Sequence, residues 1–323
     1  MAVGGALFRP QTYQIQNVAL PLVALVVAAF LAKWVSPAVR IGLLCRAQKI
    51  PLSFRSALLA HLAAMFVAAF TPNNTGVAPA TVAALGRLGV PLGRGIGVAV
   101  EIFVLDLIFF AWTVPLGLAY LAHSDAIALP PGTRTAALAT TALTITGAVL
   151  LVRYPRLVTG LLLTSARWPR LNRFAPRLRR SARDYYRSAI AFRTATARTW
   201  LALNVITASQ WFGSFILFWS LLRLYGVQAN PLTVLAILSS LTLASHFVPT
   251  PGAAGFMEAA VGFSICGQAG AAAALLIWRL ASFYAIFVLG PLAGLLLHLA
   301  RPNAAANGVA DGASSTYGGR SRP

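Results

Sequence analysis

Four ionisable residues interrupt the long apolar stretches of this sequence: Glu101, Asp106, Glu258 and Arg279. A charge at the centre of a hydrocarbon layer costs about 3 kcal/mol or more, so such residues usually pair or line a cavity. A rise of about 1.5 Å per helical residue puts Asp106 and Arg279 at nearly the same depth, with Glu101 offset by ~10 Å. Arg279 then has one of two roles. Either it binds a lipid phosphate, with the carboxylates modulating it, or it forms a structural pair with Asp106.

The residues that would indicate an enzyme are missing from the sequence. It has no His/Cys/Asp cluster, no nucleophile–base spacing and no Walker sequence, and its four histidines lack metal-ligand spacing. The stretch GRGIG, 93–97, precedes a membrane segment without following a strand, so it fails the context test for dinucleotide binding. We therefore expect no catalytic residue, no metal and no organic cofactor.

Two Pro/Gly-rich breaks separate the apolar runs, FTPNNTG at 70–76 and FVPTPGAAG at 247–255. Each follows a short apolar run that ends in Phe-x-Pro and precedes a small-residue stretch and a long charged helix. Paired breaks of this kind point to a transporter site, because freed backbone groups need partners at membrane depth. They are either tips of re-entrant hairpins near the midplane or turns at the membrane surface. With the four charges, they supply the predicted lipid-binding and translocation residues: Pro72, Asn73, Asn74, Gly76, Glu101, Asp106, Pro249, Pro251, Gly252, Gly255, Glu258 and Arg279.

The composition predicts an all-α polytopic membrane protein. Of 323 residues, 58% are hydrophobic and only 10% are charged, compared with about 25% charged in soluble domains. The first apolar run is expected to be a retained helix, and the tail 301–323 to be disordered. The expected helices span about 18–36, 96–121, 135–152, 201–222 and 271–299, with hairpins at about 56–88 and 232–268.

The net charge of +20 sets the expected orientation. Twelve arginines and one acid, Asp184, fall in the linker 153–199. The positive-inside rule is best satisfied if this linker, the C-terminus, the loop 37–55 with Arg40, and Lys33 at its helix end face the cytoplasm. The two hairpins then enter from opposite sides, as an inverted-topology repeat of halves 1–152 and 200–300.

The linker itself allows two interpretations. It is either a solvated loop that sets topology, or its second part forms a basic amphipathic helix lying on anionic lipid. Its aromatic residues are too few to indicate RNA binding, so we expect no nucleic-acid partner.

Three stretches give the sequence a resemblance to the lysylphosphatidylglycerol synthase transmembrane, or flippase-like domain, family. They are 34–76, 89–110, and 248–263 together with 275–294. The family pattern Pro-Gly-x-x-Gly-x-x-Glu falls on Pro251, Gly252, Gly255 and Glu258, and the family's helix arginine falls on Arg279. The chain departs from the family in four ways, the first being that the first hairpin, which often carries charge in the family, has none in NNTGVAPA. It starts at what matches the second family helix, Glu101 is followed by Ile102 where many members have arginine, and the aminoacyl-transferase domain is absent.

The resemblance implies a stand-alone, non-enzymatic module that moves a phospholipid or polyprenyl-phosphate lipid across the cytoplasmic membrane. Its expected partners are membrane lipids, either an anionic phospholipid or a polyprenyl phosphate, and a lipid-modifying transferase. The alternatives are a membrane subunit of such a transferase and a non-transporting scaffold.

Overall fold

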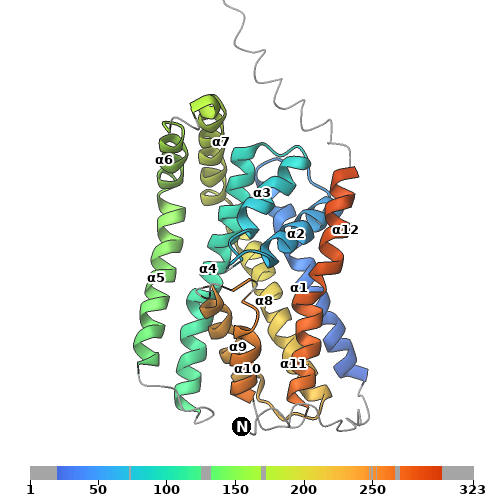
Figure 1. Ribbon diagram of the computed structural model, residues 1–323. Helices are drawn as coiled ribbons and strands as arrows, with labels where there is room; N and C mark the ends of the chain where they lie inside the picture. Colours follow the sequence, from blue (N-terminus) through green and yellow to red (C-terminus); the bar gives the residue numbers. More distant parts are fainter. Residues whose placement is uncertain are drawn as a thin grey trace, which may run out of the picture.

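The computed structural model describes residues 20–72, 74–124, 132–168, 172–246, 248, 250–251, 253–265 and 270–299, and these residues form helices joined by short turns (Figure 1). The predicted tail 301–323 lies outside the described residues. So do Asn73, Pro249 and Gly252 of the predicted site.

The first part of the chain forms four helices: α1 (Leu20–Ala47), α2 (Phe54–Ala69), α3 (Val77–Arg87) and α4 (Leu92–His123). Helix α1 continues well past residue 36, where the expected segment ended, and it carries Pro37 in its interior. The prediction of a loop at 37–55 is therefore wrong for residues 37–47, which belong to α1. Proline is tolerated inside membrane helices because neighbouring groups satisfy the freed carbonyl. Helix α2 starts at a conventional cap, where the Ser53 hydroxyl accepts a hydrogen bond from the Ser56 amide.

A connector follows, made of α5 (Thr133–Arg153), α6 (Arg156–Ser165), a short 3₁₀ turn (Asn172–Phe174) and α7 (Ala175–Arg193). Most of the described arginine linker is therefore helical. Helix α7 buries one side, including Ala182, Tyr185 and Phe192, and packs against α4. The predicted basic amphipathic helix does form here, but protein covers its apolar side.

The last part contains α8 (Ala197–Leu224), α9 (Pro231–Ser245), α10 (Phe256–Ile265), α11 (Ala271–Arg279), the π-helical turn η2 (Leu280–Tyr284) and α12 (Ile286–Leu299). Elements α11, η2 and α12 follow one another as one long apolar segment. Proline at Pro231 and the Asn230 side chain, which accepts from the Leu232 amide, start α9.

Helices of the first part of the chain pack against helices of the last part, chiefly in three pairs. Helix α1 packs against α8, α4 packs against α9, and α12 packs against α2. Small residues allow these approaches: a Cβ on Gly117 of α4 would lie 2.9 Å from the Ala236 backbone of α9, and one on Gly290 of α12 would lie 2.3 Å from Phe66 of α2. In Figure 1 the pair α2–α3 lies toward the α6–α7 end of the bundle, and α9–α10 lies toward the other end.

Among the described residues, four segments are long and apolar enough to cross a membrane: α1, α4, α8 and the α11–α12 segment. The bent pair α5–α6 passes the same test as a broken span, whereas α2 and α9 are apolar but short. Many large apolar side chains are exposed along these helices, as expected for a surface that contacts lipid. The chain is an all-α multi-pass membrane protein.

Candidate functional site at the meeting of two helix breaks

The two helix breaks contact each other. Pro72 and Pro251 form an isolated antiparallel bridge, the only one among the described residues. The bridge aligns two copies of the pattern Thr-Pro-x-x-x-Gly, 71–76 and 250–255. The third residue after each threonine has a positive φ, 54° at Asn74 and 52° at Ala253. The residue that contacts Pro72 is thus Pro251, the second proline of its break.

Each break satisfies its backbone in a different way. At the first, the Thr71 hydroxyl donates to the Ala68 carbonyl and accepts from the Gly76 amide at 2.9 Å. At the second, the Glu258 carboxylate accepts from the Gly255 amide at 2.7 Å. Polar partners of this kind are what a loop at membrane depth requires. Glu258 therefore holds the second break in shape.

Glu258 also forms an ion pair with Arg279, at 2.5 Å between Oε1 and Nε. The guanidinium of Arg279 is buried, lies over the Phe283 ring at 4.5 Å, and has a buried Nη2 without a hydrogen-bond partner. The π-helical turn η2 begins directly after Arg279. Such turns are frequent at functional sites. Arg279 thus keeps donor capacity beside the contact between the two breaks.

The predicted pair between Arg279 and Asp106 is wrong. Asp106 instead pairs with Arg40 of α1 at 2.6 Å and also accepts a hydrogen bond from the Trp211 indole of α8 at 2.9 Å. Arg40 was assigned to a cytoplasmic loop because the first membrane segment was expected to end at residue 36. With α1 continuous, Arg40 lies buried inside the bundle, where a carboxylate must compensate its charge.

Lys33 is a second cation that the sequence analysis misplaced. It lies well inside α1 and not at a helix end, and its charge interacts with that of Arg279. The next residue, Trp34, donates to the Ala281 carbonyl of η2 at 3.2 Å, which fixes this part of α1 beside Arg279. Within the described residues Lys33 forms no ion pair. The sequence did indicate that Lys33 lies within the membrane segment, because it falls inside an apolar run of nineteen residues, 18–36.

Glu101 lies elsewhere, against the connector. It is buried, and it accepts hydrogen bonds from Ser188 of α7 at 2.7 Å and from the Gln48 amide at 3.1 Å. Burial, and then the charge of Glu101, raise the pKa of Tyr185 in α7 to about 12. Glu101 thus fastens α7 to α4 and does not take part in the contact between the breaks.

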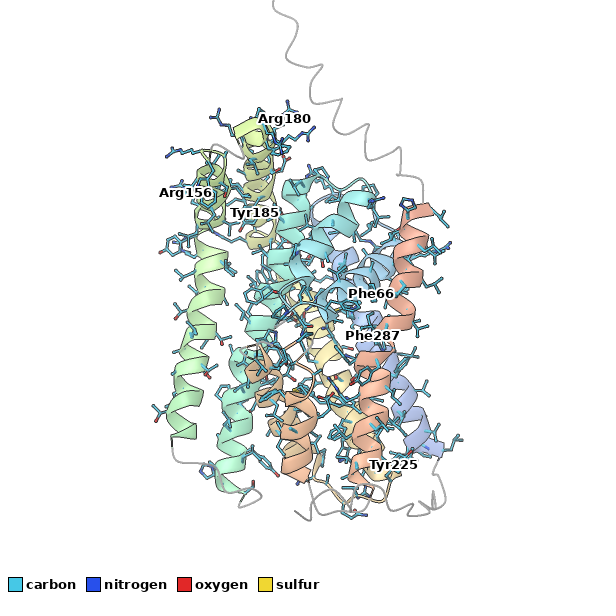
Figure 2. All side chains as sticks on the ribbon, viewed as in Figure 1. Phe66, Arg156, Arg180, Tyr185, Tyr225 and Phe287 are labelled. Carbon is cyan, nitrogen blue, oxygen red and sulfur yellow. The ribbon has the colours of Figure 1, made fainter. Side chains whose placement is uncertain are left out.

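We use the name tip site for Lys33, Pro72, Pro251, Glu258 and Arg279. An aromatic chain connects it to the surface: Arg279 contacts Phe283, Phe283 contacts Phe287, and Phe287 contacts Phe66 and Phe70 of α2. Figure 2 shows Phe66 and Phe287 side by side where α2 meets α12. Phe70 is 60% exposed. An aromatic surface therefore extends from the tip site to the outside of the bundle.

Groups of three or more His, Cys, Asp or Glu side chains that could hold a metal do not occur in the described part of the chain. The tip site instead contains more positive than negative charge, hydrogen-bond donors, and backbone groups that are not part of a helix.

The comparisons with known proteins agree with this description. The family model described as lysylphosphatidylglycerol synthase TM region matches residues 8–290. No curated protein and no solved structure matches the chain. The match covers most of the sequence, including every residue of the tip site. The chain therefore belongs to the lysylphosphatidylglycerol synthase transmembrane-region family and contains its membrane domain, often called flippase-like.

Proposed function

We propose that the protein moves an anionic lipid, a phospholipid or a polyprenyl phosphate, across the cytoplasmic membrane, with the lipid phosphate bound at the tip site. One observation carries the proposal. The tip site contains two cations, Lys33 and Arg279, and its one carboxylate, Glu258, forms an ion pair with Arg279 only, among the described residues. A lipid phosphate would supply the missing negative charge.

The arrangement of donors suits a phosphate. A guanidinium binds phosphate oxygens in a planar, two-point geometry, and the free Nη2 of Arg279 is available for one of these bonds. The Lys33 ammonium adds a second charge. The lipid tail would stay on the aromatic surface of Phe66, Phe70, Phe283 and Phe287 while the headgroup crosses. Neither step needs a covalent reaction.

The packing pattern supports an inverted repeat, in which α1–α4 correspond to α8–α12. In this scheme α2–α3 and α9–α10 are re-entrant hairpins from opposite sides, and their ends meet near the midplane. The arginines of α7 and of the helix ends near it favour a cytoplasmic position for that face by the positive-inside rule. The headgroup would then have to pass only the contact between Pro72 and Pro251.

Purified protein in liposomes tests the function. Two probes are used, fluorescent phosphatidylglycerol and a labelled undecaprenyl phosphate, and their appearance in the opposite leaflet is timed. We expect faster exchange of at least one probe than in protein-free liposomes. The matched control is Arg223→Lys, because Arg223 is exposed at the end of α8, whereas Arg279→Lys changes the tip site.

Protein that is folded but speeds the exchange of neither probe would contradict the proposal. In that case the alternative, a membrane subunit of a lipid-modifying transferase, predicts a transferase that copurifies with the chain and loses activity without it.

A further inference from the structure

Helix α6 has an orientation unlike that of the spanning helices. The chain bends by 75° between α5 and α6, at Tyr154 and Pro155. If α5 crosses the membrane, α6 lies close to the membrane plane. Three of its five exposed residues are leucines: Leu157 and Leu161, four residues apart on one face, and Leu163, beside Arg156 and Thr164. Trp168, which follows the helix, is 67% exposed. Tryptophan is enriched at the level of lipid headgroups.

The neighbouring helix α7 cannot serve as the lipid-facing helix, because its buried side is already occupied. It packs into a groove of α4 formed by two glycines. A Cβ on Gly93 would lie 2.1 Å from the Ser181 carbonyl oxygen, and one on Gly97 would lie 2.1 Å from the Ser188 hydroxyl. With this side against α4 and another part packed on α6, the exposed part of α7 is basic.

The start of α7 and the 3₁₀ turn before it form a pocket of about 380 Å³, lined by Arg173, Phe174, Pro176, Arg177 and Arg180. The lining contains three guanidinium groups and no carboxylate. Among the described residues none of these three arginines forms an ion pair or a hydrogen bond, although Arg173 lies over the Phe174 ring at 4.8 Å. Figure 2 shows Arg180 and Arg156 at the same end of the molecule, on α7 and α6.

We propose that this pocket binds the headgroup of an anionic phospholipid in the leaflet on which α6 lies, as a site separate from the tip site. The apolar side of α6 lies among the acyl chains, Trp168 marks the headgroup level, and the three arginines face the phosphate of a neighbouring lipid. The three features belong to one continuous stretch, residues 156–180. The proposal depends on the membrane placement of α5 and not on transport.

The choice of a lipid over a soluble anion comes from α6. A pocket for a soluble phosphate compound would not need an uncovered leucine face and an exposed tryptophan beside it. Juxtamembrane clusters of basic residues attract anionic lipids with a factor of about 5 in affinity per Lys or Arg. The double variant Arg177→Gln/Arg180→Gln should therefore weaken retention of one anionic lipid by roughly 30-fold.

Mass spectrometry of the intact detergent-solubilised protein tests the site. The full chain is titrated with phosphatidylglycerol or phosphatidylcholine, and bound lipids are counted. We expect the wild type to hold one more phosphatidylglycerol than the double variant, and no such difference with phosphatidylcholine. The control Arg46→Gln/Arg55→Gln removes two exposed arginines outside the pocket, with the same change in net charge. It should behave as the wild type does.

Two further arms make the result decisive. Trp168→Gln with Leu161→Gln should also lower phosphatidylglycerol retention, because both side chains belong to the proposed lipid surface. Inorganic phosphate at millimolar concentration should not displace the lipid. Equal retention by wild type and the arginine variant would overturn the proposal, and so would displacement by phosphate, which would identify a site for soluble anions. Lipid exchange by the arginine variant is measured in a separate liposome assay. A variant that loses lipid retention but still exchanges lipid separates this site from the proposed transport function.

Discussion

The two intramembrane ion pairs differ in what they connect. Arg40–Asp106 joins α1 to α4, and the Trp211 hydrogen bond to Asp106 adds α8. This pair therefore links three helices from both parts of the chain. Arg279–Glu258 joins α11 only to α10, beside a helix break, and Glu258 divides its oxygens between Arg279 and the Gly255 amide. The first pair thus connects long helices, whereas the second holds a helix break in place and belongs to the site that we propose for the lipid phosphate.

The largest effect on stability is expected for Arg40→Leu. The variant leaves the Asp106 carboxylate without its cation, which should cost roughly 3–5 kcal/mol and lower the folded yield sharply. Thermal unfolding in detergent measures the effect. The double variant Arg40→Leu/Asp106→Leu should recover most of the loss, since both charges are gone. A double variant as unstable as the single one would show that the pair is not the structural link described here.

Arg279→Lys should reduce transport and leave the protein folded. Lysine retains the charge but lacks the planar fork, so lipid exchange in liposomes should fall by roughly 10- to 100-fold. The thermal midpoint should change little. Replacing Arg279 and Glu258 together with apolar residues should give folded, inactive protein. Full activity in that double variant would reduce Arg279 to a structural role and remove the difference between the two pairs.

Glu258→Gln should have an intermediate effect. Glutamine keeps an acceptor for the Gly255 amide but no longer neutralises Arg279. Binding of an anionic lipid should therefore tighten by roughly fivefold, in line with about 1 kcal/mol for one charge at close range in water. Lipid titration of purified protein measures it. Asp311→Asn, in the stretch after residue 300, makes the same change of net charge away from both proposed sites and should leave the affinity unaltered. A weaker affinity in Glu258→Gln would mean that the carboxylate contributes to lipid binding directly.

The smallest expected effect concerns the shape of the breaks. Ala253 has a φ of 52°, which costs a residue with a Cβ roughly 1 kcal/mol. Ala253→Gly should therefore raise the thermal midpoint by about 1–3 °C. Ala254→Gly is the control, because Ala254 does not have a positive φ and glycine there should be neutral or destabilising. Equal effects of both substitutions would show that the second break does not hold the conformation described.

The sequence predicted the membrane class and the helical architecture from composition and apolar run length, and the family from the residues around Pro251 and Arg279. It could not predict the ion pairs, because depth was counted from assumed helix ends. The first apolar run ends at residue 36, whereas α1 continues through Pro37 to Ala47 and carries Arg40 into the bundle. The sequence also did not predict the contact between Pro72 and Pro251, for a related reason. Phe-x-Pro is a property of sequence alone, whereas the positive φ at Asn74 and Ala253 depends on which backbone groups find partners.

The bridge between Pro72 and Pro251 also determines how many hydrogen bonds must break before the two helix breaks can separate. Neither break is part of a helix, so separating them leaves the hydrogen bonds within every helix intact. Separating the breaks therefore costs the backbone one or two hydrogen bonds, about 1 kcal/mol each. A continuous helix crossing at the same depth would have to unwind, exposing several amides to hydrocarbon at once. In the inverted repeat that we propose, the contact between the two breaks could therefore separate at a much smaller cost than a continuous helix could unwind.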